Sequence, residues 1–310
     1  MRMLTRLDDI RSISHAAREL RPDVLVVMTA HGWPTLLRDI PLLHVLRPSC
    51  RRVVLQFHGS RSSLLINPGR TPFKTATRRL VFMADLVLLL SGDERNEWIA
   101  FEPRAHYAVV ANPFVPKVEE TDAAVECSGG HSGALVILFV GRLTREKGVF
   151  DLLSAFQGVH LQQPCKLVLT GSGQAAPELR KQVTSLGLGS AVEMTGYVEP
   201  SKMLTLYRSA DVFVLPSYAE GFPTVLAEAM HAGLPIVTTG IRGAAEHLTD
   251  GENALFVQPG HPEQIEAALL RLLLDPALRA RMGHANRERV QRFAPDRVAS
   301  EYARLLADLL

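Results

Sequence analysis

The chain has 310 residues, of which 47% are hydrophobic and 21% charged, which suggests one large or two ordinary globular domains and excludes disordered and collagen-like chains. The net charge is only +2, but residues 1–117 carry 17 Lys and Arg against 10 Asp and Glu, and the remainder carries 17 against 22. Cys50, Cys127 and Cys165 lie far apart without a CxxC pair. This argues against a disulfide framework and a structural zinc site and favours a reducing cytoplasm.

The first half of the chain is predicted to contain a helix over residues 8–20 and apolar strands over residues 24–28, 53–57, 86–90 and 106–110. Continuously apolar strands that are separated by helices indicate a parallel sheet covered on both faces. The basic N-terminus has no apolar run behind it, so it is not a signal peptide, and the run from Leu80 to Leu90 is too short for a membrane span. We therefore expect a Rossmann-like domain over residues 1–115.

A basic stripe is expected on one helix of this domain. Arg70, Lys74 and Arg78 recur at helical spacing beside Phe73 and Leu80. The stripe is either a solvated helix face or a surface that contacts anionic lipid at a membrane. No basic patch interleaved with aromatic residues is present, so no nucleic-acid partner is expected.

The second half of the chain is predicted to form a complete Rossmann-like domain over residues 135–295, after a polar, glycine-rich linker over residues 116–134. Strands are expected over residues 135–140, 166–170, 192–195, 212–215, 236–239 and 254–257, with helices over 148–156, 178–186, 201–209 and 223–232 between them. After Gly260 the chain is expected to be helical. Its last helix, within residues 296–310, is predicted to pack back toward the first domain.

Loops that follow parallel strands are the places where such sheets bind ligands. In GRLTREKG, residues 141–148, Arg142 and Lys147 suit a diphosphate, although loop cations are often merely solvated. In TGSGQ, Gly171 and Gly173 allow the backbone to approach a ligand or simply make a turn. The segment TGYV, residues 195–198, ends the next strand.

The stretch AEGFPTVLAEAM, residues 219–230, places Glu220 before a helix and Glu228 one turn inside it. Pro223 suits the first helical position, and the N–H groups of Thr224 and Val225 are then available to a phosphate. Carboxylates repel phosphate, so the two acids are expected to accept hydrogen bonds from sugar and ribose hydroxyls. Complementing the helix dipole is an alternative for Glu228, but it explains Glu220 poorly.

Together these motifs resemble a known family. GRLTREKG, LVLTGSG, TGYV, ADVFVLPSYAEGFPTVLAEAMHAGLPIV and DGENALFV are similar, over residues 135–290, to the retaining glycosyltransferases of family 4, the glycosyl transferases group 1. QFHGS, ADLVLLLSGDERNEW and YAVVANPF resemble the same family more loosely. The resemblance implies the α/β GT-B fold, in which two Rossmann-like domains with parallel sheets face a cleft.

The resemblance also implies roles for individual residues. Arg142 and Lys147 would bind the donor diphosphate and stabilise the leaving nucleotide, and Glu220 would contact the transferred sugar. Glu228 would bind the ribose, and His58 would face the cleft. The other donor-binding positions that it implies are Gly171, Tyr197, Val198, Gly221, Phe222, Thr224 and Val225.

The implied function is retaining, metal-independent transfer of a sugar from a nucleotide-diphosphate sugar, such as a UDP-sugar or GDP-sugar, to a hydroxyl acceptor in polysaccharide or glycolipid synthesis. No Asp-x-Asp motif occurs, so no metal site and no cofactor are expected. The acceptor would be a saccharide or lipid-linked, with peripheral contact to the inner face of the membrane. The alternatives are a nucleotide-sugar-binding protein without transferase activity and a GT-B epimerase.

The chain departs from the family at its beginning. Members of the family start with a strand that runs into a glycine-rich loop, whereas here the first strand–helix units are expected to be missing, which leaves the first domain incomplete. A start site assigned too late, a partner that supplies the missing part and a degenerate, inactive remnant are the three explanations, and the intact motifs of the second domain argue against the last. An incomplete sheet would expose an apolar edge, so a version extended upstream is expected to be more soluble and more active.

Overall fold

The computed structural model describes residues 12–58, 65, 71–115, 133–220 and 223–310. The described chain divides into two compact units. The first unit comprises the residues up to Asn112 together with Asp296–Leu310, and the second comprises Pro113–Pro295. Most of the predicted linker, residues 116–134, lies outside the described residues.

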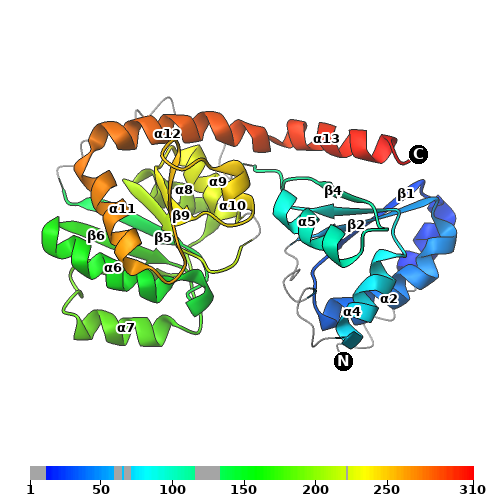
Figure 1. The fold of residues 1–310 in the computed structure, drawn as a ribbon, viewed down its shortest axis with the longest axis horizontal. Helices are drawn as coiled ribbons and strands as arrows, with labels where there is room; N and C mark the ends of the chain where they lie inside the picture. Colours follow the sequence, from blue (N-terminus) through cyan, green and yellow to red (C-terminus); the bar gives the residue numbers. More distant parts are fainter. Residues whose placement is uncertain (1–11, 59–64, 66–70, 116–132, 221–222) are drawn as a thin grey trace. The chain divides into compact units, whose positions relative to one another are not determined.

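The first unit contains a parallel sheet in the order β1-β2-β3-β4. Its strands are β1 (Val24–Thr29), β2 (Arg52–Phe57), β3 (Leu86–Leu89) and β4 (Tyr107–Val109). Residues 12–20 are helical, and the helices between the strands are α2 (Trp33–Leu46), the short 3-10 helix η1 (Arg47–Ser49), α4 (Thr71–Val81) and α5 (Gly92–Phe101) (Figure 1).

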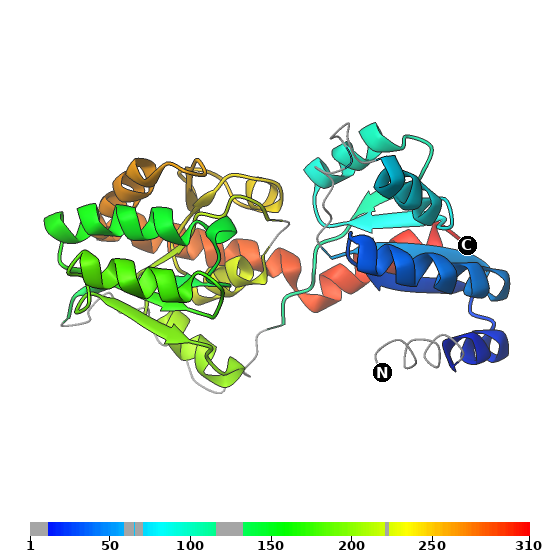
Figure 2. The ribbon, with the colours of Figure 1, turned by 90° about the horizontal axis from the view of Figure 1, so that it is seen from below.

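Alternate residues of β2 supply the two faces of this sheet, because successive side chains of a strand point to opposite sides. Val53, Leu55 and Phe57 pack with α2, α4 and α5, whereas Val54 packs with the C-terminal helix α13 (Pro295–Ala307). Figures 1 and 2 show α13 on the face opposite α2 and α4. The Tyr302 hydroxyl of α13 donates to Gln56 Oε1, so a polar contact accompanies the apolar packing.

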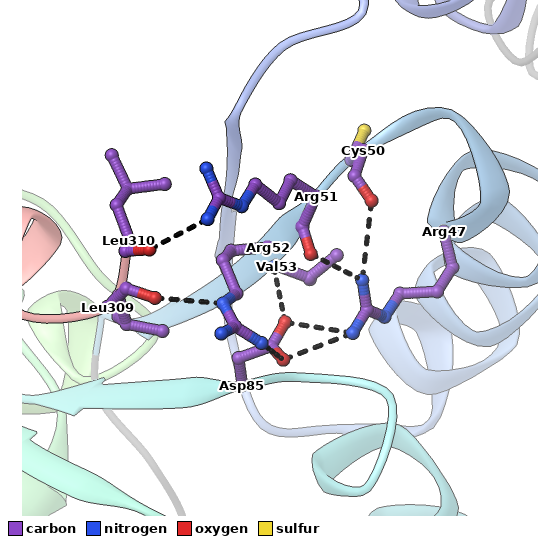
Figure 3. Close-up of polar contacts among 8 residues, drawn as sticks. All are labelled: Arg47, Cys50, Arg51, Arg52, Val53, Asp85, Leu309 and Leu310. Carbon is purple, nitrogen blue, oxygen red and sulfur yellow. Dashed lines mark hydrogen bonds and ion pairs between the residues drawn. The ribbon is translucent and has the colours of Figure 1, made fainter.

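Asp85 fixes the start of β3 (Figure 3). Its carboxylate accepts the N–H of Val53 at 2.7 Å and contacts the guanidinium groups of Arg47 at 3.0 Å and Arg52 at 3.3 Å. Arg52 also donates through Nε to the carbonyl of Leu309 at 2.8 Å. The same cluster therefore holds β2, β3 and the end of the chain together.

The second unit contains a six-stranded parallel sheet in the order β10-β9-β8-β5-β6-β7. Its strands are β5 (Leu135–Val140), β6 (Cys165–Thr170), β7 (Val192–Gly196), β8 (Val212–Leu215), β9 (Ile236–Thr239) and β10 (Ala254–Val257). Its helices are η2 (Arg145–Lys147), α6 (Val149–Gln162), α7 (Ala176–Ser185), α8 (Pro200–Arg208), α9 (Thr224–Ala232), α10 (Gly243–His247), α11 (Pro262–Leu274), α12 (Pro276–Val290) and η3 (Gln291–Phe293). This strand order is the Rossmann order, as predicted.

The ten predicted strands are all confirmed, and no predicted end lies more than one residue from the observed one. The prediction for the first helix of the second unit is wrong at its C-terminal end: α6 continues to Gln162 rather than ending at Phe156. Gly158 lies inside this helix because α11 packs closely against it. A Cβ at Gly158 would lie 2.2 Å from Glu266 Oε2.

Candidate functional site

The order of the strands brings two of the predicted loops together. β5 and β8 are neighbours in the middle of the sheet, pairing Ile137 with Val212 and Leu138 with Phe213. The chain then continues from β5 toward one edge of the sheet and from β8 toward the other. Ligands of open parallel sheets bind at such a switch point, beyond the carboxyl ends of the strands. The loop with Arg142 and Lys147 follows β5, and the loop with Glu220 follows β8.

The backbones of these two loops are in direct contact. The N–H of Tyr218 donates to the carbonyl of Glu146 at 2.8 Å. Gly148 has a φ of +68°, and a Cβ at this position would lie 2.1 Å from the carbonyl oxygen of Pro216. Only glycine fits this left-handed backbone conformation at so close an approach. The glycine that ends GRLTREKG therefore sets the distance between the two loops.

An ion pair joins the two loops at the site. Lys147 Nζ contacts Glu220 Oε1, and the two side chains are only 15% and 13% exposed. The hydroxyl of Ser217 donates to the same carboxylate oxygen at 2.9 Å. The site thus holds a shielded cation and a shielded carboxylate side by side. The predicted roles place these two groups at different parts of a ligand, and the sequence carries no signal for their direct contact.

The glycines after β6 are required by contacts between neighbouring loops. Gly171 has a φ of +131°, and its N–H donates to the carbonyl of Gly196 at 2.8 Å. A Cβ at Gly171 would lie 2.0 Å from the carbonyl oxygen of Gly141, and one at Gly173 would lie 2.2 Å from that of Leu143. These two glycines therefore let the loops after β5, β6 and β7 pack on one another at the carboxyl edge of the sheet.

Helix α9 begins one residue later than predicted. Pro223 is its N-cap in an extended conformation, and Thr224 is the first helical residue. The fixed φ of proline, here −70°, suits both positions, so the sequence alone does not distinguish them. Thr224 is exposed and Val225 half-buried at the start of the helix, where the first N–H groups lack partners within the helix. Gly221 and Phe222 lie outside the described residues.

Glu228 lies one turn inside α9, as predicted, and contacts a residue that the sequence analysis missed. The hydroxyl of Tyr207, on α8, donates to Glu228 Oε2 at 2.8 Å. Tyr207 is only 2% exposed, and burial together with the neighbouring carboxylate raises its pKa well above the usual value. The shift favours the protonated phenol, which is the form that donates to Glu228.

The remaining predicted residues are distributed over three strand ends. Arg142 follows β5 and is exposed, and Tyr197 and Val198 follow β7, where Tyr197 is exposed and Val198 half-buried. His58 follows β2 in the first unit, where it is exposed and its backbone N–H donates to the carbonyl of Thr29 at 2.9 Å. The residues that the second unit brings to one edge of its sheet are Arg142, Lys147, Gly171, Tyr197, Val198, Glu220 and the first turn of α9.

Two other features bear on the choice of site. A cavity of about 420 Å³ lies in the first unit, lined by Arg52, Asp85, Arg104 and His106 among others. It lies at the amino ends of the strands, the edge at which parallel sheets do not usually bind ligands. Within the described residues, no helix is long and apolar enough to span a membrane, and no group of three or more His, Cys, Asp or Glu is placed to hold a metal ion.

The family model of the glycosyl transferases group 1 matches residues 128–289, which is more than half of the chain. The chain belongs to this family. An uncharacterised glycosyltransferase of Methanocaldococcus jannaschii is 35% identical over 167 residues, which cover 54% of this chain and 43% of that protein. The D-inositol 3-phosphate glycosyltransferase of Corynebacterium diphtheriae is 30% identical over 280 residues, which cover 84% of this chain and 64% of that protein. The chain thus spans less than two thirds of the length of either relative.

Solved structures give the fold of this group 1 member. Anabaena HepE in complex with UDP and glucose matches with a TM-score of 0.78 at 23% identity, covering 96% of this chain and 80% of that one. Sucrose-phosphate synthase of Thermosynechococcus elongatus matches with a TM-score of 0.77 at 22% identity, covering 92% and 73%. The structural neighbours are GT-B glycosyltransferases, so the predicted fold class is confirmed.

Proposed function

We propose that the protein is a retaining glycosyltransferase that moves a sugar from a nucleoside-diphosphate sugar to a hydroxyl acceptor. The observation that carries the proposal is the shielded pair of Lys147 and Glu220 at the switch point of the second sheet. An ammonium group there suits the donor diphosphate, and a carboxylate beside it suits the hydroxyls of the sugar. Family membership supports the same reaction class.

The proposed roles follow from charge. Departure of the nucleotide builds negative charge on the diphosphate, which Arg142, Lys147 and the N–H groups at the start of α9 would stabilise. Lys147 would then exchange its contact with Glu220 for the phosphate oxygens. Glu220 would turn to the transferred sugar, while Glu228 would accept hydrogen bonds from the ribose. Retention would follow from attack on the face that the nucleotide leaves, with a phosphate oxygen taking the acceptor proton.

The test is turnover of donor by variants at the ion pair. Lys147→Ala and Glu220→Gln are expected to abolish transfer and to leave only a small residual hydrolysis of donor, while both variants remain folded by circular dichroism. Wild-type turnover in either variant would contradict the proposed roles. Binding of a nucleoside diphosphate by the wild-type protein, without any transfer or hydrolysis, would instead identify a binding protein. The anomeric configuration of the product, read by NMR, tests retention.

We also propose that the reaction needs no divalent metal, because Arg142, Lys147 and the start of α9 supply the positive charge that a metal would bring to the diphosphate. Turnover is then expected to be unchanged in excess EDTA. A loss of activity in EDTA that Mg²⁺ or Mn²⁺ restores would contradict this part of the proposal.

The acceptor that we propose is a saccharide or lipid-linked intermediate of polysaccharide or glycolipid synthesis, at the cytoplasmic face of the membrane. The excess of 17 Lys and Arg over 10 Asp and Glu in residues 1–117 supports it. The basic stripe supports it less, because Arg78 pairs with Glu102 at 3.3 Å and stacks on Phe101. Sedimentation with vesicles that contain anionic lipid, but not with neutral vesicles, is the expected result.

A further inference from the structure

One oxygen of the Glu220 carboxylate carries both of that group's hydrogen bonds. Oε1 accepts from the ammonium group of Lys147 and, at 2.9 Å, from the hydroxyl of Ser217. Within the described part of the chain, no hydrogen bond reaches the second oxygen, Oε2. The carboxylate is therefore held in its orientation through Oε1, while Oε2 is available to a ligand.

The two partners of Oε1 differ in what a diphosphate would do to them. Lys147 carries its charge at the end of a long side chain with many rotatable bonds, and a phosphate would compete for it. Ser217 is neutral, has a short side chain and is fully buried. A phosphate would not be attracted to this neutral group and could not reach its buried hydroxyl. The contact between Ser217 and Glu220 would survive donor binding, whereas the ion pair would not.

The backbone of Ser217 is itself held in place from the neighbouring strand. Its carbonyl oxygen accepts from the hydroxyl of Thr239, on β9, at 2.7 Å. Two residues earlier, the carbonyl of Leu215 accepts from the hydroxyl of Thr238 at 2.8 Å. The four side chains Ser217, Thr238, Thr239 and Leu215 are all buried. The serine is thus attached to the rigid part of the sheet, ahead of the loop that carries Glu220.

We propose that Ser217 is a positioning residue for the reaction: it keeps the carboxylate of Glu220 oriented when the donor diphosphate takes Lys147 away, and so presents Oε2 to a hydroxyl of the transferred sugar. The inference rests on the proposed function and extends it to a residue for which the motif analysis gave no role. Ser217 acts through Glu220 alone. It does not touch the diphosphate.

The experiment is a double-mutant cycle on donor turnover with Ser217→Ala and Glu220→Gln, using whichever of the UDP-, GDP- or ADP-sugars the wild-type protein turns over. Because a hydrogen bond to a charged group is lost, Ser217→Ala is expected to lower kcat about ten- to hundred-fold. The affinity for the free nucleoside diphosphate is expected to stay within about two-fold, since no phosphate contact changes. In the Glu220→Gln background, Ser217→Ala is expected to have little further effect on residual hydrolysis.

Thr238→Val is the matched control, because it removes another buried hydroxyl bond to the same segment without touching Glu220. It is expected to lower the melting temperature but leave kcat unchanged. If Ser217→Ala does not fold, Ser217→Cys keeps the size with a weaker donor and takes its place in the cycle.

Equal losses from Ser217→Ala in both backgrounds, or an equal loss of kcat in Thr238→Val, would overturn the inference and leave the proposed function standing. A folded wild-type protein that neither transfers nor hydrolyses any of these donors would overturn both. A kcat loss that is confined to the background with Glu220 supports both.

Discussion

Tyr207 shows how a single buried hydroxyl orients a carboxylate of the candidate site. It donates to Glu228 Oε2 at 2.8 Å from a position that is 2% exposed. Glu228 is expected to bind the ribose of the donor, so Tyr207 would decide how well this carboxylate is aimed at the ribose hydroxyls. The phenylalanine variant keeps the packing of the ring and removes only the hydrogen bond.

Tyr207→Phe is therefore expected to weaken binding of the nucleoside diphosphate about three- to ten-fold, as the loss of one hydrogen bond predicts. Binding of the 2′-deoxy nucleotide should change less, because it lacks one of the hydroxyls that Glu228 binds. Isothermal titration with both nucleotides measures this difference. The same loss for both nucleotides would show that Tyr207 does not act through a contact of Glu228 with the 2′-hydroxyl.

A substitution at Gly148 tests whether the close contact between the two loops of the candidate site matters for stability. Ala at this position would combine a left-handed backbone, at φ +68°, with a Cβ only 2.1 Å from the carbonyl oxygen of Pro216. Gly148→Ala is expected to destabilise the second unit by more than about 3 kcal/mol, because both the backbone strain and the clash must be relieved. Gly187→Ala is the matched control, since Gly187 has a φ of +69° with open space around it and should cost only about 1–2 kcal/mol. Equal losses of unfolding free energy in the two variants would show that the contact with Pro216 is unimportant.

In both sheets an aspartate before a central strand makes the same pair of hydrogen bonds with the neighbouring strand. Asp85 precedes β3 and Asp211 precedes β8; each accepts a backbone N–H from the neighbouring strand, from Val53 at 2.7 Å and from Val136 at 2.8 Å. The backbone N–H of each aspartate donates back to the same residue at 2.8 Å. Only Asp85 adds contacts to two arginines, Arg47 and Arg52 (Figure 3).

A comparison of the two aspartates separates two contributions to the free energy of unfolding. One is the hydrogen bond from the backbone N–H, and the other is the contact with the arginines. Asp211→Asn is expected to cost about 1 kcal/mol through its single hydrogen bond. Asp85→Asn is expected to cost about 1–2 kcal/mol more, because two guanidinium groups lose a partner that is partly shielded from water. Urea unfolding of the two variants measures both values. An equal cost would show that the arginines contribute nothing to the stability of the first unit.

The sequence predicted the elements well because both sheets are parallel and buried. Strands such as residues 135–140 and 254–257 are short, continuously apolar runs between helices, and this pattern has few other interpretations. The end of α6 was missed because the helix continues through Gly158, where the absence of a side chain admits Glu266 of the neighbouring helix. This reason lies in the tertiary packing of the two helices, which the local sequence does not indicate.

The residues of the candidate site could be named from the sequence, but the contacts between them could not. Lys147 and Glu220 lie 73 residues apart in the chain, and only the strand order makes them neighbours. Tyr207 was missed for a similar reason, since its contact with Glu228 depends on how α8 packs beside α9. Roles for Arg142, His58 and Tyr197 remain predictions of the family resemblance.

At the scale of the whole molecule, the chain forms two units with separate cores. The last helix, α13, follows the second unit in the sequence but packs its residues Val298, Tyr302, Leu305 and Leu306 on the sheet of the first. The candidate donor site, in contrast, is built within the second unit from the loops after β5, β6, β7 and β8. Stability and donor binding are therefore expected to be separable between the units.

Removing residues 296–310 tests this separation. The deletion exposes the apolar face of the first sheet, including Val54 and Leu88, so the first unit is expected to lose most of its cooperative unfolding. The second unit is expected to keep its own transition and its affinity for the nucleoside diphosphate. If the deletion variant no longer binds nucleotide, the second unit does not form the donor site by itself.

The measurement that tests the central claim most directly is calorimetric unfolding of the wild-type protein and of Lys147→Ala with UDP, GDP, ADP and their sugars. A nucleotide at about 100 times its dissociation constant should stabilise the wild-type second unit by about 2.7 kcal/mol. The account predicts such a shift with one base in the wild-type protein and a much smaller shift in Lys147→Ala. No shift with any nucleotide, or an equal shift in the variant, would contradict a donor site at Lys147 and Glu220.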